Sequence, residues 1–361
     1  MTTKSIAFKG TIKSCGIVNF DGKDAKRMLK KAKLDFRNQL SYDNVKVAKH
    51  AYVCEGTDTE GHPIYKAFLK ISKDCLRNGI FKIDQPFHNP GIVYAKQQLI
   101  GLLASFAGLL RGYMFADEGI KRKSPVYISD AVQVSNNVST MDIGTQDSPK
   151  ESKIDADAEA GLTMHFKESI GGLVTYEFQG AIDISELQFI SLSQIYDRLA
   201  VDPNYLEYYI QALEATLGSK VSAKAFYTKT TATNGLPEEG ILLTPEQVKV
   251  LVVAFFTRLL DLEIFRGANG RAWLESLEII PKQSGLDFNK KGFAVKSAED
   301  VRKNIGEPHT FYTEYNEANA LKLYEDIEVG KKNLAGNKNA AKVAKKEAKD
   351  KQKATSTPIV E

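Results

Sequence analysis

The segment from Lys96 to Ala131 reads KQQLIGLLASFAGLLRGYMFADEGIKRKSPVYISDA. Its apolar part predicts a helix over residues 97–115 that carries Arg111-Gly112-Tyr113 near its end. The cations Lys121, Arg122 and Lys123 follow, and Ser124-Pro125 opens a β-rich run over residues 126–134. A buried helix that brings clustered cations to the edge of a strand suits an anionic backbone. The same residues also fit a core helix, a solvated loop and a strand, so the rest of the chain must decide.

Composition places the chain among ordinary globular proteins. It has 361 residues, of which 43% are hydrophobic and 26% charged, enough for one large domain with insertions or two smaller ones. The N-terminus lacks the apolar stretch of a signal peptide, and the longest uncharged apolar runs, residues 99–110 and 250–257, are too short to span a bilayer. The three cysteines have no CxxC spacing, which favours neither disulfides nor zinc. We expect a cytoplasmic protein with no membrane partner.

The net charge of +4 conceals a strong segregation of charge along the chain. Residues 1–130 hold 22 Lys/Arg against 12 Asp/Glu, residues 131–330 hold 18 against 30, and residues 331–361 hold 9 against 3. Such asymmetry indicates contact with nucleic acid, and it also allows copies of the chain to attract each other.

The order of expected elements predicts an α+β fold of the ferredoxin or RNA-recognition type with long insertions. We expect strands at 5–18, a hairpin from 51–55 and 64–71, a strand at 126–134, a hairpin from 162–167 and 173–180, and a strand at 272–280. Helices are expected at 24–37, 97–115, 204–217 and 245–265. The polar stretch at 135–160 is expected to be a loop or finger, and the one at 219–243 a second polar excursion. Residues 331–361 are expected to form a Lys/Ala-rich flexible tail.

Motifs for common enzyme chemistry do not occur in the sequence. It contains no GxxxxGK[ST], GxGxxG, HExxH or GxSxG, and its five histidines have no metal-ligand spacing. These observations favour a protein without catalytic residues, metal ions or cofactors.

Two glycine-containing segments resemble phosphate- or base-binding motifs, and each has a structural alternative. Residues 111–115, RGYMF, match the start of a base-stacking strand motif, but we expect them to continue the helix, with Arg111 reaching solvent. Residues 266–271, RGANGR, resemble a GxxG phosphate loop, although here we expect a helix-to-strand turn in which Gly267 caps the helix. Arg266 and Arg271 flank this turn and remain candidates for phosphate binding.

A basic stripe is expected near the N-terminus. Lys26 and Arg27 lie in the expected basic helix, and Lys13 lies in the first strand beside it. A charge run of this kind is also typical of a plain solvated face.

Together these segments resemble the RAMP-type backbone subunit of class 1 CRISPR effector complexes, closest to type I-F variants or type IV. The resemblance rests on the strand from residue 5, the helix ending in Leu110-Arg111-Gly112, the basic strand that follows, and the closing segment EEGILLTPEQVKVLVVAFFTRLLDLEIFRGANGRAW. It implies a palm of RNA-recognition topology over residues 1–330 and copies that polymerise along a CRISPR guide RNA. It also implies other effector subunits and target nucleic acid as partners.

The resemblance further implies a thumb at residues 219–243 and guide-binding cations at particular positions. On the palm these are Arg111, Lys121, Arg122 and Lys123, and on the thumb they are Lys224 and Lys229. Two alternatives stay open. Asp21, after the first strand, stands where type III relatives place a metal-dependent ribonuclease residue, and an unrelated nucleic-acid-binding scaffold would show the same charge layout.

Overall fold

The structure is a computed structural model that describes residues 2–20, 45–46, 48–57, 59, 61–82, 96–146, 163–193, 198–230, 235–266, 270–282 and 288–328. The chain divides into two compact units, one of residues 1–222 with 242–310 and one of residues 223–241 with 311–361. The helix expected at 24–37, Asp21 and the tail at 331–361 lie outside the described residues. The single palm expected over residues 1–330 stays a prediction.

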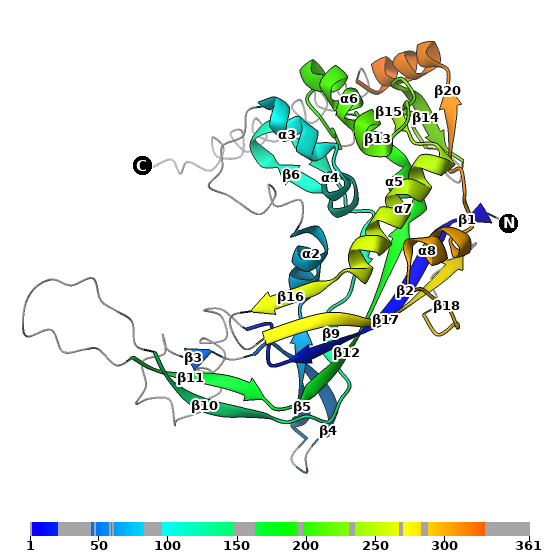
Figure 1. The fold of residues 1–361 in the computed structure, drawn as a ribbon. Helices are drawn as coiled ribbons and strands as arrows, with labels where there is room; N and C mark the ends of the chain where they lie inside the picture. The colour runs from blue at the N-terminus through cyan, green and yellow to red at the C-terminus, as the bar shows by residue number, and fades with distance from the viewer. Residues whose placement is uncertain are drawn as a thin grey trace, which may run out of the picture. The chain divides into compact units, whose positions relative to one another are not determined.

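A large antiparallel sheet forms the centre of the first unit (Figure 1). Among the described residues, nine strands belong to it, and they pair in antiparallel fashion. Its main path runs through β16 (Glu263–Arg266), β17 (Gly270–Lys282), β2 (Ser5–Cys15), β12 (Leu173–Asp183), β9 (Ala131–Gln133), β5 (Pro63–Ile71) and β4 (His50–Thr57). β18 (Phe293–Ala294) pairs with β17, and β8 (Val126–Ile128) pairs with β12. The mixed α+β class expected from the sequence is therefore confirmed.

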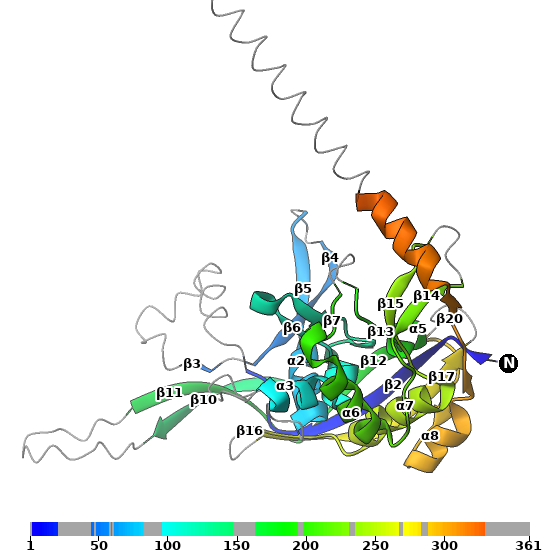
Figure 2. The same ribbon diagram turned by 90° about the horizontal axis from the view of Figure 1, so that it is seen from above.

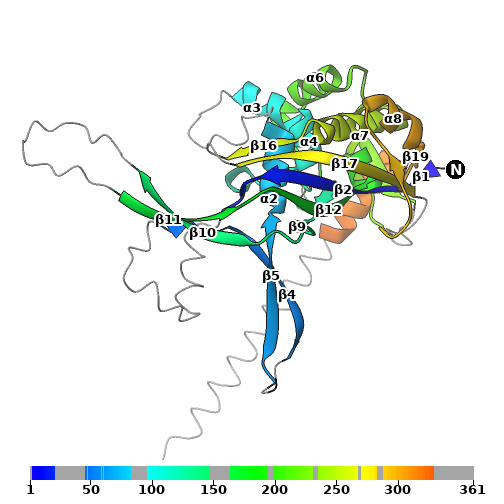
Figure 3. The same cartoon turned by 60° about the horizontal axis from the view of Figure 1, so that its bottom comes forward.

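Helices cover one face of this sheet and leave the other face polar. Figure 3 shows α4 (Phe106–Arg111) and α7 (Pro245–Leu260) on the same side of β2, β12 and β17. α2 (Lys73–Phe81) packs against both of these helices. Phe8 of β2 is fully buried, and its ring centroid lies 5.5 Å from that of Phe255 and 5.4 Å from that of Phe256 on α7. Thr244 and Gln247 form a capping box at the start of α7, as the sequence Thr244-Pro245-Glu246-Gln247 predicts.

Shorter elements complete the first unit. Helical elements are α3 (Lys96–Leu103), η4 (Ala116–Glu118), α5 (Ile184–Gln188), η5 (Pro203–Tyr205), α6 (Leu206–Leu217) and α8 (Ala298–Asn304). Short strands outside the large sheet are β1 (Thr2–Thr3), β3 (Val45–Lys46), β6 (Tyr113–Phe115), β7 (Ile120–Arg122), β13 (Phe189–Ser191) and β19 (Glu307–Pro308). No helix in the described part of the chain is long and apolar enough to cross a membrane.

The single helix expected over residues 97–115 is wrong. Ser105 breaks it into α3 and α4, because its hydroxyl accepts a hydrogen bond from the Gly108 amide and caps the second helix. Gly112 ends α4 with φ of 72°, and a Cβ there would lie 2.5 Å from the Arg122 carbonyl oxygen. Tyr113–Phe115 then forms β6, which pairs with β7 as a ribbon.

The hairpin expected around Ile170-Gly171-Gly172 is also corrected. β11 (Thr163–Ile170) pairs with β10 (Ser139–Gln146), whereas β12 pairs with β2, β8 and β9. The polar stretch expected as a loop or finger thus contains a long strand, β10. Figure 2 shows the β10–β11 and β4–β5 hairpins projecting from the sheet in different directions.

Glu168 fastens the bases of these two hairpins to each other. Its carboxylate lies 3.1 Å from Nε2 of His50 at the start of β4 and accepts hydrogen bonds from the Ser139 hydroxyl on β10 and the Ala48 amide. Only 7% of the residue is exposed. Burial acts to raise the pKa of Glu168, but the hydrogen bonds from His50, Ser139 and Ala48 outweigh it and hold the pKa below its usual value.

We expect Glu168→Gln to lower the melting temperature at neutral pH. A carboxyl group whose pKa falls on folding stabilises the fold above its unfolded pKa, near 4.3, and loses that contribution as the pH falls further. The difference between wild type and Glu168→Gln should therefore be about 1–3 kcal/mol at pH 7 and should shrink below about pH 4. Thermal unfolding across this pH range checks it. A constant difference at every pH would contradict the ionic role of Glu168.

The second unit contains the short strands β14 (Ala225–Lys229), β15 (Glu238–Leu242) and β20 (Tyr312–Tyr315), followed by a helix over residues 317–328. β14 pairs with both β15 and β20 in antiparallel fashion. The Tyr324 hydroxyl donates to the Pro237 carbonyl, and the Phe226 and Tyr324 rings lie 5.8 Å apart. The polar excursion expected at 219–243 is thus built around a short strand pair.

Candidate nucleic-acid interface

Arg122 lies in the interior, so its predicted role in binding phosphate is corrected. Only 8% of the residue is exposed. Its guanidinium donates to the carbonyls of Leu109 at 3.2 Å, Phe189 at 3.0 Å, and Glu186 and Leu187 at 3.3 Å each. The sequence shows Arg122 only as the middle member of three consecutive cations. Because adjacent side chains of a strand face opposite sides, Arg122 can face the interior while its two neighbours do not. Arg122 ties β7 to α4, α5 and β13 and thereby positions the cations around it.

Its neighbours Lys121 and Lys123 are less buried. Lys121 is half-buried and lies opposite Met114 in the β6–β7 ribbon, and 72% of Met114 is exposed. The Lys123 side chain is 70% exposed, and its ammonium lies 4.0 Å from the Glu186 carboxylate. Exposed ion pairs of this length are weak, so Lys123 can exchange its partner for a phosphate at little cost.

A hollow of about 610 Å³ lies beside these lysines, between α2 and the turn from α4 into β6. Its lining includes Asp74, Arg77 and Asn78 of α2, Arg111 at the end of α4, and the β6 residues. We call this the arginine hollow. Nη2 of Arg77 donates to the Arg111 carbonyl at 2.5 Å and to the Ser124 hydroxyl at 3.5 Å, which fixes its guanidinium next to the end of α4.

Both arginines are half-buried, and their charges oppose each other. Burial lowers the pKa of Arg77, and the nearby Asp74 carboxylate counteracts this. Burial is also the largest influence lowering the pKa of Arg111; the positive charge of Arg77 lowers it further, and the Asp74 carboxylate acts in the opposite direction. The hollow thus holds two partly desolvated guanidinium groups against one carboxylate, and this net positive charge favours the entry of an anion. Arg77 is not among the residues predicted from the sequence, although Ser72 before KDCLRNGIF is a helix-start signal that indicates α2.

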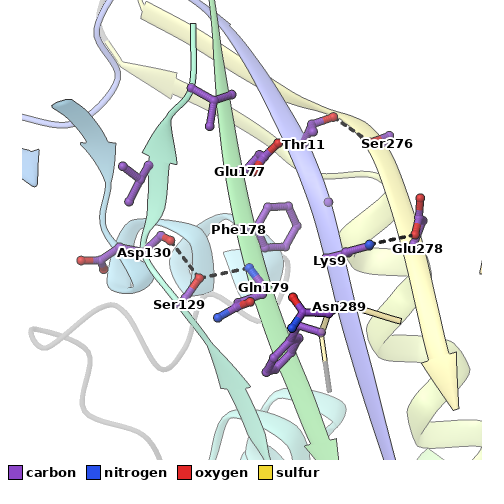
Figure 4. A pocket seen from close by; sticks show the side chains of 14 residues that line it. Lys9, Thr11, Ser129, Asp130, Glu177, Phe178, Gln179, Ser276, Glu278 and Asn289 are labelled. Carbon is purple, nitrogen blue, oxygen red and sulfur yellow. Dashed lines mark hydrogen bonds and ion pairs between the residues drawn. The ribbon is translucent and has the colours of Figure 1, made fainter. Parts of the chain in front are cut away.

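The open face of the large sheet is polar but nearly neutral. A hollow of about 780 Å³ lies on it. Figure 4 shows Lys9 of β2 pointing toward Glu278 of β17 in this hollow. Lys9 pairs with Glu278 at 3.4 Å, Lys13 with Glu275 at 2.7 Å, and Lys70 with Asp130 at 3.1 Å. Lys13 therefore lies on this face, and the Glu275 carboxylate already balances its charge. A neutralised face attracts a polyanion less than the arginine hollow does.

The turn between Arg266 and Arg271 joins two strands, β16 and β17, which corrects the expected helix-to-strand turn. Arg266 is exposed at the end of β16. Arg271 pairs with Glu263 at 2.7 Å, and its guanidinium lies 5.2 Å from the centre of the Phe265 ring. Residues 267–269 lie outside the described residues, so only the flanking Arg266 and Arg271 of the predicted GxxG phosphate loop are discussed.

The remaining predicted cations are Lys224, Lys229, Lys26 and Arg27. Lys224 pairs with Glu239 at 2.9 Å, and the Lys229 ammonium lies 6.0 Å from the Phe311 ring centre; both belong to the second unit. Lys26 and Arg27 lie outside the described residues. Within the described ranges, no group of three or more His, Cys, Asp or Glu side chains could hold a metal ion.

Solved structures of CRISPR complexes contain chains with a weak likeness to this one. One is titled "Cryo-EM structure of the Type III-B Cmr-beta bound to cognate target RNA", with 12% identity, a TM-score of 0.27, and coverage of 50% of this chain and 47% of that chain. Another is titled "CRISPR RNA-guided surveillance complex", with 12% identity, a TM-score of 0.25, and coverage of 65% and 66%. This chain thus spans about half of the first and two thirds of the second. No curated protein matches the sequence.

Family comparison gives the decisive match. A family model described as "Type I-Fv CRISPR-associated protein Cas7fv-like" covers residues 2–319, which is most of the chain. It selects the type I-F variant over type IV, the two subtypes that the resemblance left open. The chain belongs to the Cas7fv-like family of type I-Fv CRISPR-associated backbone proteins.

Proposed function

We propose that this protein is a non-catalytic subunit that binds CRISPR guide RNA and polymerises along it in a surveillance complex. The observation that carries the proposal is the gathering of Arg77, Arg111, Lys121 and Lys123 around the β6–β7 ribbon. A subunit that accepts any guide must contact phosphate and ribose and leave the base edges free for pairing. Cations at the end of a helix and on a short ribbon suit this requirement.

The large sheet with helices on one face supports a palm of RNA-recognition type. The thumb stays a prediction at residues 219–243, and the β4–β5 hairpin is a second candidate because it exposes aromatic residues. Tyr52 is 61% exposed and Tyr65 is 59% exposed. Exposed rings on a projecting hairpin can stack against bases without reading their sequence.

Co-expression with and without a CRISPR array tests the proposed function. We expect the protein purified with the array to carry a discrete short RNA and to elute as an assembly, and the protein purified without it to lack that RNA. Absorbance, gel electrophoresis and size-exclusion chromatography measure these outcomes. A monomer free of RNA in both preparations would refute the proposal.

The same preparation tests the alternative of a ribonuclease that uses Asp21. Incubation of the loaded assembly with complementary RNA and magnesium should leave that RNA intact. Cuts at regular intervals that disappear in Asp21→Ala would instead establish catalysis.

A further inference from the structure

We infer that the arginine hollow is a nucleotide-binding subsite in which Arg77 and Arg111 hold one backbone phosphate and Met114 supports the attached sugar or base. This inference rests on the proposed function and assigns a particular part of its RNA-binding surface. It adds Arg77, on a separate helix from the other cations, to the residues that touch RNA. The ligand is a single-stranded nucleic acid, recognised through its backbone.

Geometry supports a phosphate in this place. The Arg77 guanidinium is held by the Arg111 carbonyl and the Ser124 hydroxyl, so little conformational entropy is lost when an anion binds it. Arg111 lies on the last turn of α4 and lines the same hollow, where the two guanidinium groups outnumber the single carboxylate, that of Asp74. Planar guanidinium groups bind phosphate oxygens through paired hydrogen bonds, which lysines cannot do.

The surroundings favour a nucleic acid over a protein carboxylate. The hollow of about 610 Å³ is larger than one carboxylate needs, and Asn78 offers both a donor and an acceptor to a ribose or base. Met114 is 72% exposed, and a polarizable thioether packs well against an aromatic base. Lys121 faces the Met114 position across the ribbon, and Lys123 follows two residues later, so the positive charge continues for a second phosphate.

Binding of a fluorescein-labelled twelve-nucleotide oligouridylate to the full chain tests the inference. The variants are Arg77→Gln with Arg111→Gln, and as a control Arg302→Gln with Lys303→Gln, two exposed cations of α8 that give the same loss of charge. We expect the first pair to weaken binding about 10–100-fold and to flatten the salt dependence by about one unit of slope. We expect the control pair to change affinity less than about 3-fold.

A second variant distinguishes a loss of RNA binding from a loss of folding. Met114→Glu alters an exposed side chain, so we expect an unchanged melting temperature and about 10-fold weaker binding. Equal effects of the two double variants, or no effect of Met114→Glu, would overturn the subsite while guide RNA still co-purifies. An acidic peptide that competes as well as an unlabelled oligonucleotide of equal charge would also overturn it. Loss of RNA from the wild type itself would refute the proposed function instead.

Discussion

We expect Arg122→Met to unfold at a markedly lower temperature than the wild type, and to do so without RNA present. The substitution keeps a long side chain but removes the donors for the carbonyls of Leu109, Glu186, Leu187 and Phe189. Each buried carbonyl left without a donor costs about 1–3 kcal/mol. We expect the free energy of unfolding to fall by about 3–5 kcal/mol and the melting temperature by about 5–15 °C.

Arg302→Met is the matched control, because Arg302 is exposed on α8. It should shift the melting temperature by less than about 2 °C. Arg122→Lys should fall between the two, since an ammonium keeps the charge but cannot reach several carbonyls in one plane. Thermal unfolding followed by circular dichroism measures all three. An Arg122→Met protein that melts like the wild type and loses RNA would restore Arg122 to the binding surface.

The second large loss of stability is expected for Gly180→Ala, at the centre of the sheet. A Cβ at this position of β12 would lie 2.2 Å from the ring of Phe8 and 2.5 Å from the Tyr127 carbonyl oxygen. Phe8 cannot withdraw because Phe255 and Phe256 pack against it, and the carbonyl belongs to the paired strand β8. Overpacking at such a site costs about 2–3 kcal/mol, and chemical denaturation should show this loss.

Gly101→Ala makes the same chemical change where the structure leaves room. Gly101 lies within α3, and no atom lies within 4 Å of the position that its Cβ would take. Alanine favours a helix over glycine by about 0.8–1.0 kcal/mol, so this variant should be slightly more stable than the wild type. The two glycine variants should therefore move the denaturation midpoint in opposite directions. Shifts of the same sign would show that packing at Gly180 does not decide the outcome.

The sequence predicted the long elements of the fold because their patterns are strong and local. β2, the β4–β5 hairpin, α7 and β17 all lie close to where alternation, a turn or a capping box placed them. The helix predicted over residues 97–115 was wrong because a serine N-cap and a glycine with positive φ interrupt an apolar run that remains periodic on either side. The pairing of β12 was missed because strand partners are chosen by contacts distant in sequence.

The candidate site was predicted in part. Arg111, Lys121 and Lys123 do lie around one ribbon, as the run of cations implies. Arg122 was misassigned because composition cannot tell which member of a basic triplet faces the core. Arg77 could not be linked to Arg111 from sequence, since α2 and α4 are brought together only by the packing of both helices on the sheet.

The position of β2 bears on how the chain is made. The strand lies between β12 and β17, so its partners begin at Leu173 and Gly270, long after it leaves the ribosome. At about 5–20 residues per second, the nascent β2 waits on the order of 10–50 s before both of its edges can be covered. Late pairing of this kind slows folding and leaves an aggregation-prone strand exposed. We therefore expect chaperones that hold unfinished chains, and slower translation or lower temperature during expression, to raise the yield of this protein.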